Sequence, residues 1–245
     1  MVINKLDDLS YDIIFPFYKD YKYLKKAISS VNNQSLIPKN LVFIDDGNKD
    51  PNLKNLIKNL LSKKINLKFI KQENNYGNIY GVNEGLKHVE TEFFFIMAAD
   101  DIYYDDLALI SLKNLKKYKN AGFVFSNVIS NFEDLNKKIT IKYSFLKKEF
   151  YNSDDSKKIL KYKKIKFYHN TVFYRSDFFK QSNYFKDIIG PRCDFYNLIF
   201  FSAEYGFVYV NQQLAEFSIR SGQINRQYDD SYLLQEIEKI KLNFK

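Results

Sequence analysis

Two pairs of adjacent aspartates are the side chains in this sequence best placed to do chemistry. Asp45-Asp46 directly follows the apolar residues 41–44, and Asp100-Asp101 directly follows residues 93–99. Adjacent carboxylates repel each other unless water, hydrogen-bond donors or a cation lie between them. Hard divalent cations prefer carboxylate oxygens, but aspartates also favour the start of a helix. A metal site and a helix cap therefore both remain open for Asp100-Asp101.

The segments before both pairs are predicted to be buried strands. Residues 93–99 are uncharged and mostly bulky, and such a run is typical of a strand covered on both faces of a parallel sheet. In an open α/β sheet, ligands bind at the carboxyl ends of the strands. Both carboxylate pairs would then lie at the same, ligand-binding edge of one sheet.

Strands and helices alternate along the first half of the chain. The apolar patterns predict strands at 12–17, 41–44, 67–70 and 93–99, and helices at 21–32, 53–61, 79–88 and 105–117. Pro16 has no N–H to donate, so the first strand is expected to end there or to lie at an edge. The alternation predicts an α/β fold with a right-handed, mostly parallel central sheet flanked by helices.

The second half of the chain is less regular. Its patterns predict strands at 122–128, 171–175 and 207–210, a helix at 192–205 with Gly206 as its cap, and a last helix at 229–244. Residues 137–141 and 143–146 are expected to pair as short antiparallel strands, and the segment up to 166 to be flexible or partly helical. We expect a single domain spanning residues 1–245.

The composition limits the possible functions. The chain has 245 residues, 45% of them hydrophobic, and a net charge of +9. Residues 137–166 contain eleven lysines and three acidic residues, while the rest of the chain is close to balanced, which argues against a nucleic-acid-binding protein. The basic segment would suit phosphorylated substrates or an anionic membrane surface, or is simply a solvated face.

Few residues are available for disulfides or metal binding by soft ligands. Cys193 is the only cysteine, and His88 and His169 are the only histidines, which exclude an internal disulfide and disfavour structural zinc. The first residues contain no apolar signal core, and no run approaches the roughly 20 apolar residues that span a bilayer. These features predict a cytoplasmic protein, in peripheral contact with the inner face of the membrane if the basic segment binds lipid.

Several short segments, in their order and spacing, resemble those of family 2 glycosyltransferases, which have the GT-A fold. They are Ile13-Ile14-Phe15-Pro16-Phe17-Tyr18, residues 27–35 ending in Gln34-Ser35, Asp45-Asp46-Gly47-Asn48-Lys49-Asp50, Asn75-Tyr76-Gly77 and Asn83-Glu84-Gly85-Leu86. The resemblance covers about residues 11–225. It implies transfer of a sugar, with inversion, from a nucleotide-diphosphate donor, with UDP as the expected nucleotide, to a hydroxyl of a glycan or lipid-linked acceptor.

The resemblance also implies roles for particular residues. Asp100 matches the position that binds Mn²⁺ or Mg²⁺, and Asp194 matches the general base that opens a later helix. The residues expected to bind the nucleotide sugar are Pro16, Tyr18, Asp45, Asp46, Gly77, Asn83, Asp101 and Arg220. Residues 11–128 would form the nucleotide-sugar-binding half, residues 129–228 the acceptor half, and residues 229–245 a C-terminal helix.

The sequence departs from the family pattern at several of these positions. Ala98 stands where the first aspartate of the metal motif is usual, Val82 where an arginine is usual, and Cys193 where a glutamate precedes the base. Arg220 lies near the expected place of a histidine and would act on phosphate charge instead. A catalytically degenerate protein that binds a nucleotide or glycan is the alternative. The absence of glycine from residues 17–20 disfavours a nucleotidyltransferase and a dinucleotide-binding dehydrogenase.

Overall fold

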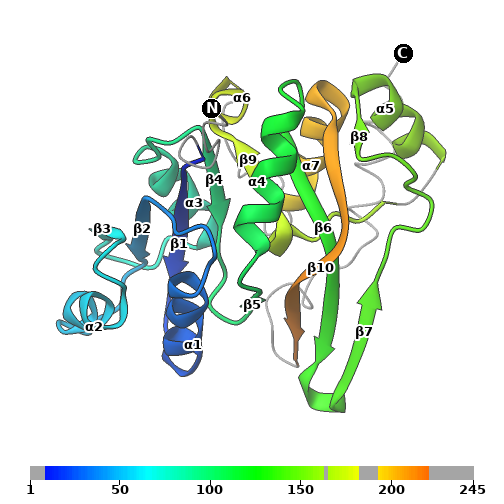
Figure 1. The fold of residues 1–245 in the computed structure, drawn as a ribbon. Helices are drawn as coiled ribbons and strands as arrows, with labels where there is room; N and C mark the ends of the chain where they lie inside the picture. Colours follow the sequence, from blue (N-terminus) through cyan, green and yellow to red (C-terminus); the bar gives the residue numbers. More distant parts are fainter. Residues whose placement is uncertain (1–8, 163–164, 182–192, 221–245) are drawn as a thin grey trace, which may run out of the picture.

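The structure of the protein is a computed structural model that describes residues 9–162, 165–181 and 193–220. These residues form one ten-stranded sheet with helices on both faces (Figure 1). Its strands are β1 (Tyr11–Phe17), β2 (Asn40–Asp45), β3 (Asn66–Lys71), β4 (Phe93–Ile96), β5 (Ile102–Tyr103), β6 (Phe123–Phe132), β7 (Lys137–Ile141), β8 (Phe150–Tyr151), β9 (Phe173–Arg175) and β10 (Phe207–Ile219).

The helices connect these strands. They are α1 (Tyr21–Asn32), α2 (Leu53–Leu60), α3 (Asn78–Leu86), α4 (Leu107–Lys117), α5 (Ser153–Tyr162), α6 (Ser176–Gln181) and α7 (Cys193–Tyr205), with short 3₁₀ turns η1 (Glu133–Leu135) and η2 (His169–Thr171). The predicted helix at 229–244 lies outside the described residues.

The strand order is β3-β2-β1-β4-β9-β6-β10-β5. Strands β3, β2, β1 and β4 run parallel, as do the long strands β6 and β10. Strand β9 joins the two parallel groups and is antiparallel to both β4 and β6, while short strands β5, β7 and β8 add antiparallel pairs. The predicted α/β class, with a mostly parallel central sheet between helices, is confirmed.

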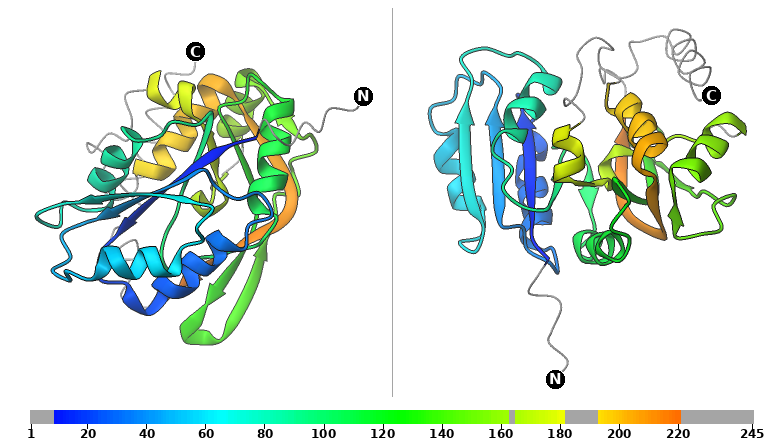
Figure 2. Two further views of the ribbon diagram at one scale, coloured as in Figure 1. Left: turned by 60° about the vertical axis from the view of Figure 1, so that its left-hand side comes forward. Right: turned by 90° about the horizontal axis from the view of Figure 1, so that it is seen from above.

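Two apolar layers cover the sheet, one on each face (Figure 2). The alternation of side chains along β1 sends Ile13 and Phe15 to the layer formed with α1, α2 and α4, and Ile14 to the layer formed with α3, α5, α6 and α7. Helix α1 buries Leu24, Ala27, Ile28 and Val31, which is the stripe that its sequence predicts.

Two glycines bring α3 close to β1. A Cβ atom at Gly85 would lie 2.4 Å from Cγ2 of Ile14, and one at Gly81 would lie 3.2 Å from Cβ of Pro16. Real Cβ atoms do not approach a neighbour as closely as 2.4 Å, so Gly85 of the Asn83-Glu84-Gly85-Leu86 segment is required by packing. Through these contacts, α3 is held against the strand whose end borders the candidate site.

The prediction that the first strand ends at Pro16 or lies at an edge of the sheet is wrong. Strand β1 continues to Phe17 and is central, between β2 and β4. The carbonyl of Ile14 accepts a hydrogen bond from Met97 N, so the backbone of Pro16, two residues later, faces the same side. Strand β4 ends at Ile96, and its pairing with β1 stops at Ile14, so Pro16 needs no N–H there.

The second half departs from its predicted pairing. Strand β7 pairs with the second part of β6, not with residues 143–146, which form a turn and no strand. The chain reverses through η1 and through Asn136, whose φ of 45° is left-handed. Polar residues such as Ser130 and Asn131 concealed this part of β6, since only an apolar run was taken as strand. The lysine-rich segment is partly helical, as expected, through α5.

Candidate functional site

Both carboxylates of Asp45-Asp46 are bonded by groups of the chain itself. Oδ1 of Asp45 accepts hydrogen bonds from the backbone N (2.9 Å) and from Nδ2 (2.8 Å) of Asn48. Asp46 accepts from the backbone N of Tyr76 (2.8 Å) and of Gly77 (3.0 Å), one with each carboxylate oxygen. Both aspartates are buried. The pair therefore fixes two loops at the carboxyl ends of β2 and β3, and its predicted contact with a nucleotide stays a prediction.

An open pocket lies beside these loops. It has a volume of about 590 Å³ and is lined by Tyr18, Lys19, Tyr21 and residues Gly47 to Asp50. Lys19 has a left-handed φ of 59°, and its backbone N donates to Oδ1 of Asn48 at 2.9 Å, so the Asp45–Asn48 bonds also shape this wall. The pocket lies within the size range of small-molecule sites.

Tyr18 borders this pocket, as expected of a residue that contacts the nucleotide. Nζ of Lys19 lies 4.7 Å from the centre of its ring. Hydrogen bonding to Lys19, and then to Asn75, lowers the pKa of the Tyr18 hydroxyl. The ring is thus available beside a positive charge, an arrangement suited to an aromatic base that carries phosphates.

The two residues of Asp100-Asp101 occupy different environments. Asp101 is buried, and its Oδ1 accepts a hydrogen bond from the backbone N of Ser218 at 3.1 Å. Burial raises the pKa of Asp101 well above its usual range, and the charge of Asp100 adds to this effect. The Ser218 N–H, Arg220 and the Asn170 amide lower the pKa of Asp101 by smaller amounts. Asp101 therefore links the loop that follows β4 to strand β10.

Asp100 is paired with Arg220. Oδ2 of Asp100 lies 2.7 Å from Nη1 of Arg220, and Nη2 of the same guanidinium lies 4.0 Å from Oδ1 of Asp20. The guanidinium carbon lies 4.6 Å from the ring centre of Tyr23. The structure thus brings together two predicted site residues, Asp100 and Arg220. Asp20 and Tyr23 were not predicted to belong to the site. No sequence signal marks them, because their contacts with Arg220 depend on the end of β10 lying beside the start of α1.

Hydrogen bonds of Tyr103 and Gln34 stabilise the loop that carries Asp100-Asp101. The hydroxyl of Tyr103 accepts from the backbone N of Ala98 (2.8 Å) and donates to its carbonyl (3.1 Å). Nε2 of Gln34 donates to the carbonyls of Tyr104 (2.8 Å) and Ser30 (3.2 Å). Gln34, the residue of the Gln-Ser segment, therefore ties α1 to the chain that follows β5.

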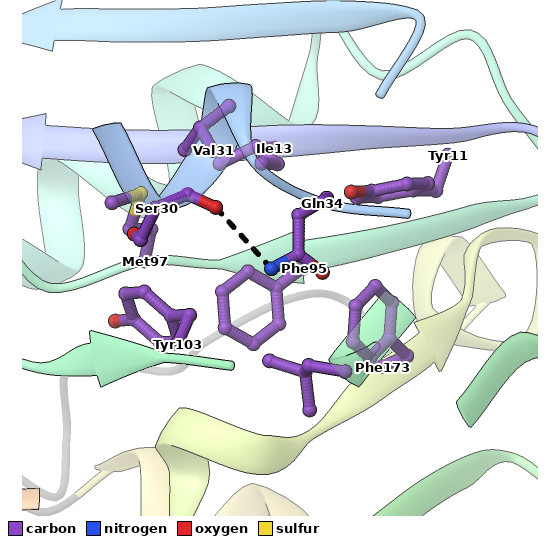
Figure 3. A pocket seen from close by; sticks show the side chains of 10 residues that line it. Tyr11, Ile13, Ser30, Val31, Gln34, Phe95, Met97, Tyr103 and Phe173 are labelled. Carbon is purple, nitrogen blue, oxygen red and sulfur yellow. Dashed lines mark hydrogen bonds between the residues drawn. The ribbon is translucent and has the colours of Figure 1, made fainter. Parts of the chain in front are cut away.

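A small cavity under this loop is not a ligand site (Figure 3). Its lining is mostly apolar and includes Ile13, Phe95, Met97 and Phe173, and its volume is only about 10 Å³, near the minimum for one water molecule. Gln34 lines it too, and its Nε2 donates to the carbonyl of Ser30. This cavity therefore offers no room for a ligand of Asp100.

Asp194 lies in the first turn of α7, as predicted. Its Oδ1 accepts a hydrogen bond from the backbone N of Phe195 at 2.7 Å. Burial lowers the pKa of His169, and the charge of Asp194 partly opposes this effect. The amide of the next residue, Asn170, lowers the pKa of Asp101, so η2 lies near both Asp101 and Asp194. The role of Asp194 as general base stays a prediction.

The remaining predicted residues lie on or against α3. Gly77 is the residue before the helix, with a φ of 89° and a ψ of 163°, a conformation that essentially only glycine adopts. A Cβ atom at Gly77 would meet nothing within 4 Å, so the space beside it is open. Pro16 packs against Gly81, and Asn83 is half-buried on α3. Their contacts with a nucleotide sugar stay predictions.

A divalent cation at this site would depend on its other ligands. Within residues 9–162, 165–181 and 193–220, no three His, Cys, Asp or Glu side chains are placed to hold a metal ion. Asp100 offers one partly exposed carboxylate. Mg²⁺ is commonly bound by one or two carboxylates together with phosphate oxygens of a substrate, so Asp100 fits a metal that shares a diphosphate. In the part of the chain that the structure describes, no helix is both long and apolar enough to cross a membrane.

Comparison with solved structures identifies the fold. The structure of Staphylococcus aureus TarS residues 1–349 in complex with UDP-GlcNAc matches with a TM-score of 0.72 and 19% identity, covering 96% of this chain and 67% of TarS. The complex of the same TarS fragment with UDP matches with a TM-score of 0.69. The expected GT-A fold is therefore confirmed.

Sequence comparison identifies the family. The chain is 28% identical over 148 residues to a teichoic acid poly(glycerol phosphate) polymerase of Staphylococcus epidermidis, and 31% identical over 94 residues to an uncharacterized glycosyltransferase of Haemophilus influenzae. These matches cover 58% and 38% of this chain, but only 20% and 37% of the relatives' own lengths. The model of glycosyl transferase family 2 matches residues 12–199, well over half of the sequence. The chain belongs to glycosyl transferase family 2.

Proposed function

We propose that this protein transfers a sugar from a nucleoside-diphosphate sugar, with UDP as the nucleotide, to a hydroxyl of a glycan or lipid-linked acceptor, with inversion at the sugar. One observation carries the proposal: the open pocket bordered by Tyr18 lies at the same sheet edge as Asp100 and Arg220, within a GT-A fold. TarS, which shares this fold, has been solved with UDP and with UDP-GlcNAc. The relative from S. epidermidis is named for a glycerol phosphate polymer.

Asp194 is the proposed general base. An acceptor hydroxyl is a weak nucleophile, and a carboxylate that takes its proton contributes about 10²–10⁴-fold to the rate. Asp194 lies in the first turn of α7, and η2 lies near both Asp194 and Asp101. Attack from this side, opposite the leaving diphosphate, would invert the anomeric centre.

Asp100 and Arg220 are proposed to act on the leaving diphosphate. Asp100 would hold Mn²⁺ or Mg²⁺ together with phosphate oxygens, and the metal would supply positive charge as the nucleoside diphosphate departs. Arg220 provides a planar guanidinium that can bind two phosphate oxygens at once. Tyr18 would stack on the base, and the buried Asp101 would keep the loop of Asp100 attached to β10.

Contact with an anionic membrane or a lipid-linked acceptor is proposed for α5. The lysines of the basic segment are spread over β7, the loop that follows it, α5 and Lys166; in Figure 1, β7 reaches toward the bottom of the view and α5 lies near the top. Helix α5 carries Lys157, Lys158 and Lys161 and ends at Tyr162, which is 72% exposed. Basic side chains beside an exposed aromatic ring suit a membrane interface in the cytoplasm. Equal binding of the protein to neutral and anionic vesicles would refute this contact.

The transferase proposal is tested by donor binding and turnover of the full chain. We expect UDP to raise the melting temperature in the presence of Mn²⁺, since a ligand at about 100 times its Kd stabilises the folded state by about 2.7 kcal/mol. Incubation with UDP-sugars should release UDP. Stabilisation by a nucleotide without release of UDP from any donor would favour the binding protein without turnover, and no stabilisation by any nucleoside diphosphate would overturn the proposal.

The base assignment needs a variant that separates binding from chemistry. Asp194→Asn should retain UDP binding and lose transfer by about 10²-fold or more. Asp177→Asn is a matched control, because Asp177 also lies in the first turn of a helix, α6, and any effect through the helix dipole would be similar there. Transfer that is equal in Asp194→Asn and Asp177→Asn would contradict the assignment.

A further inference from the structure

The proposed metal-binding carboxylate already has a cation of the chain as its partner. Arg220 holds Oδ2 of Asp100 at 2.7 Å, beside Asp20 and over the ring of Tyr23. We propose that Arg220 is a built-in counter-cation of Asp100 that excludes a divalent ion from this carboxylate until the donor diphosphate draws the guanidinium away. The proposal deepens the proposed function and rests on it.

Competition between the two cations follows from their positions. The guanidinium donates to one oxygen of the carboxylate that would hold the metal ion, and two cations on one carboxylate repel each other. The side chains of Arg220 and Asp100 are only 22% and 19% exposed, so water screens the pair less than it would a fully exposed one. A metal ion that binds Asp100 only after Arg220 has left has an apparent affinity reduced by the fraction of molecules in which Arg220 is away.

The surroundings of Arg220 allow it to leave Asp100 without leaving the site. Its guanidinium rests on Tyr23, which belongs to α1, and lies 4.0 Å from Asp20. These contacts would keep the cation close after its bond to Asp100 breaks. A diphosphate offers Arg220 oxygens in the paired geometry that a guanidinium binds best.

The donor should therefore promote binding of the metal. The diphosphate would draw Arg220 from Asp100 and would also complete the ligands of the cation, which the described residues do not supply by themselves. Because linkage is reciprocal, the factor by which UDP raises the affinity for Mn²⁺ equals the factor by which Mn²⁺ raises the affinity for UDP. Arg220 would thus make uptake of metal and donor a joint event.

The test measures Mn²⁺ binding to the full chain, from the electron paramagnetic resonance signal of free Mn²⁺, with and without UDP. Without UDP, Arg220→Gln should bind Mn²⁺ about tenfold more tightly than the wild type, because the competing cation is gone. The enhancement of Mn²⁺ affinity by UDP should be smaller in Arg220→Gln by a similar factor. Tyr23→Leu, which removes the supporting ring and keeps both charges, should shift the affinity in the same direction but less.

Two controls define the result. Lys148→Gln removes one positive charge from a pair with Asp155 at 3.1 Å on the other half of the molecule, and it should leave Mn²⁺ binding unchanged. Asp100→Asn should lose the binding in either background. Melting temperatures of all variants establish that they are folded.

The outcomes separate the two proposals. Equal Mn²⁺ affinity in the wild type and in Arg220→Gln, or no binding in either, would overturn the role of Arg220. A tenfold difference together with UDP-dependent enhancement supports it. If Arg220→Gln binds Mn²⁺ more tightly but no nucleoside diphosphate binds any variant, competition at Asp100 stands and the proposed function fails.

Discussion

Asp45-Asp46 and Asp100-Asp101 have the same sequence pattern at the same edge of one sheet, yet they have different surroundings. The first pair is bonded by backbone and side-chain groups of the neighbouring loops, so its partners are fixed by the fold. In the second pair, Asp101 is buried and accepts a hydrogen bond from the backbone of β10, while Asp100 is paired with the long side chain of Arg220, which has several rotatable bonds. A carboxylate bonded by backbone N–H groups shapes a site, and one bonded by a flexible side chain can exchange its partner for a ligand.

Asp12, at the opposite edge of the sheet, extends this comparison and should give the largest loss of stability. It is fully buried, and its carboxylate accepts from Nδ2 of Asn40 (2.8 Å) and from the backbone N of Glu90 (2.7 Å) and Thr91 (3.3 Å). Asp12→Ala should lower the free energy of unfolding by about 3–5 kcal/mol, because buried donors would lose their acceptor. Urea unfolding with an unchanged m-value measures the loss.

A graded control accompanies this variant. Asp12→Asn keeps one carbonyl oxygen as an acceptor and should cost less than Asp12→Ala. A loss below about 1 kcal/mol for Asp12→Ala would mean that water replaces the carboxylate, and the network would then carry little of the stability.

Asp46→Ala should give the second largest loss, about 2–3 kcal/mol. It removes the acceptor of Tyr76 N and Gly77 N, but these donors lie in a partly exposed loop, and Gly77 N also donates to Oδ1 of Asn75 at 3.0 Å. The loss is therefore expected to be smaller than at Asp12. The same unfolding measurement applies, with Asp50→Ala as the control at a partly exposed aspartate whose carboxylate accepts from the backbone N of Asn52 at 2.8 Å.

If Asp46→Ala were as stable as Asp50→Ala, the internal bonds of the first pair would not be needed by the fold. The contrast with Asp100-Asp101 would then disappear, and Asp46 would be free to serve a ligand instead.

The regular half of the fold could be predicted from the sequence because its signals are local. The periodicity of residues 21–32 gives α1 with its bounds, and the apolar runs give β2, β3 and the start of β4. The end of β4 was predicted too late, at residue 99. Beyond Ile96 and Met97, the backbone of Ala98 is bonded by the hydroxyl of Tyr103 and not by a neighbouring strand, and the apolar run does not encode this contact.

The second half and the partners at the site depend on contacts between distant residues. Strand β10 runs on to Ile219 past a bulge near Gln213, and its polar residues 211–213 hid this continuation. Only this continuation brings Ser218 to Asp101 and Arg220 to Asp100. The sequence therefore predicted which aspartates lie at the edge of the sheet. It did not predict which of their carboxylates are hydrogen-bonded by other groups of the chain.

Asp100→Asn should give the smallest loss of stability, within about 1 kcal/mol. An ion pair between partly exposed side chains contributes little, and Arg220 keeps its contacts with Tyr23 and Asp20 when the charge of Asp100 is removed. The difference from the wild type in urea unfolding should shrink further in 1 M NaCl, because salt screens the pair. The variant should nevertheless lose Mn²⁺ binding. At Asp100 the main effect is thus expected on metal binding, whereas at Asp46 it is expected on stability. A loss at Asp100 as large as that at Asp46 would show that both pairs serve the fold, and an exchangeable carboxylate would have to be sought elsewhere.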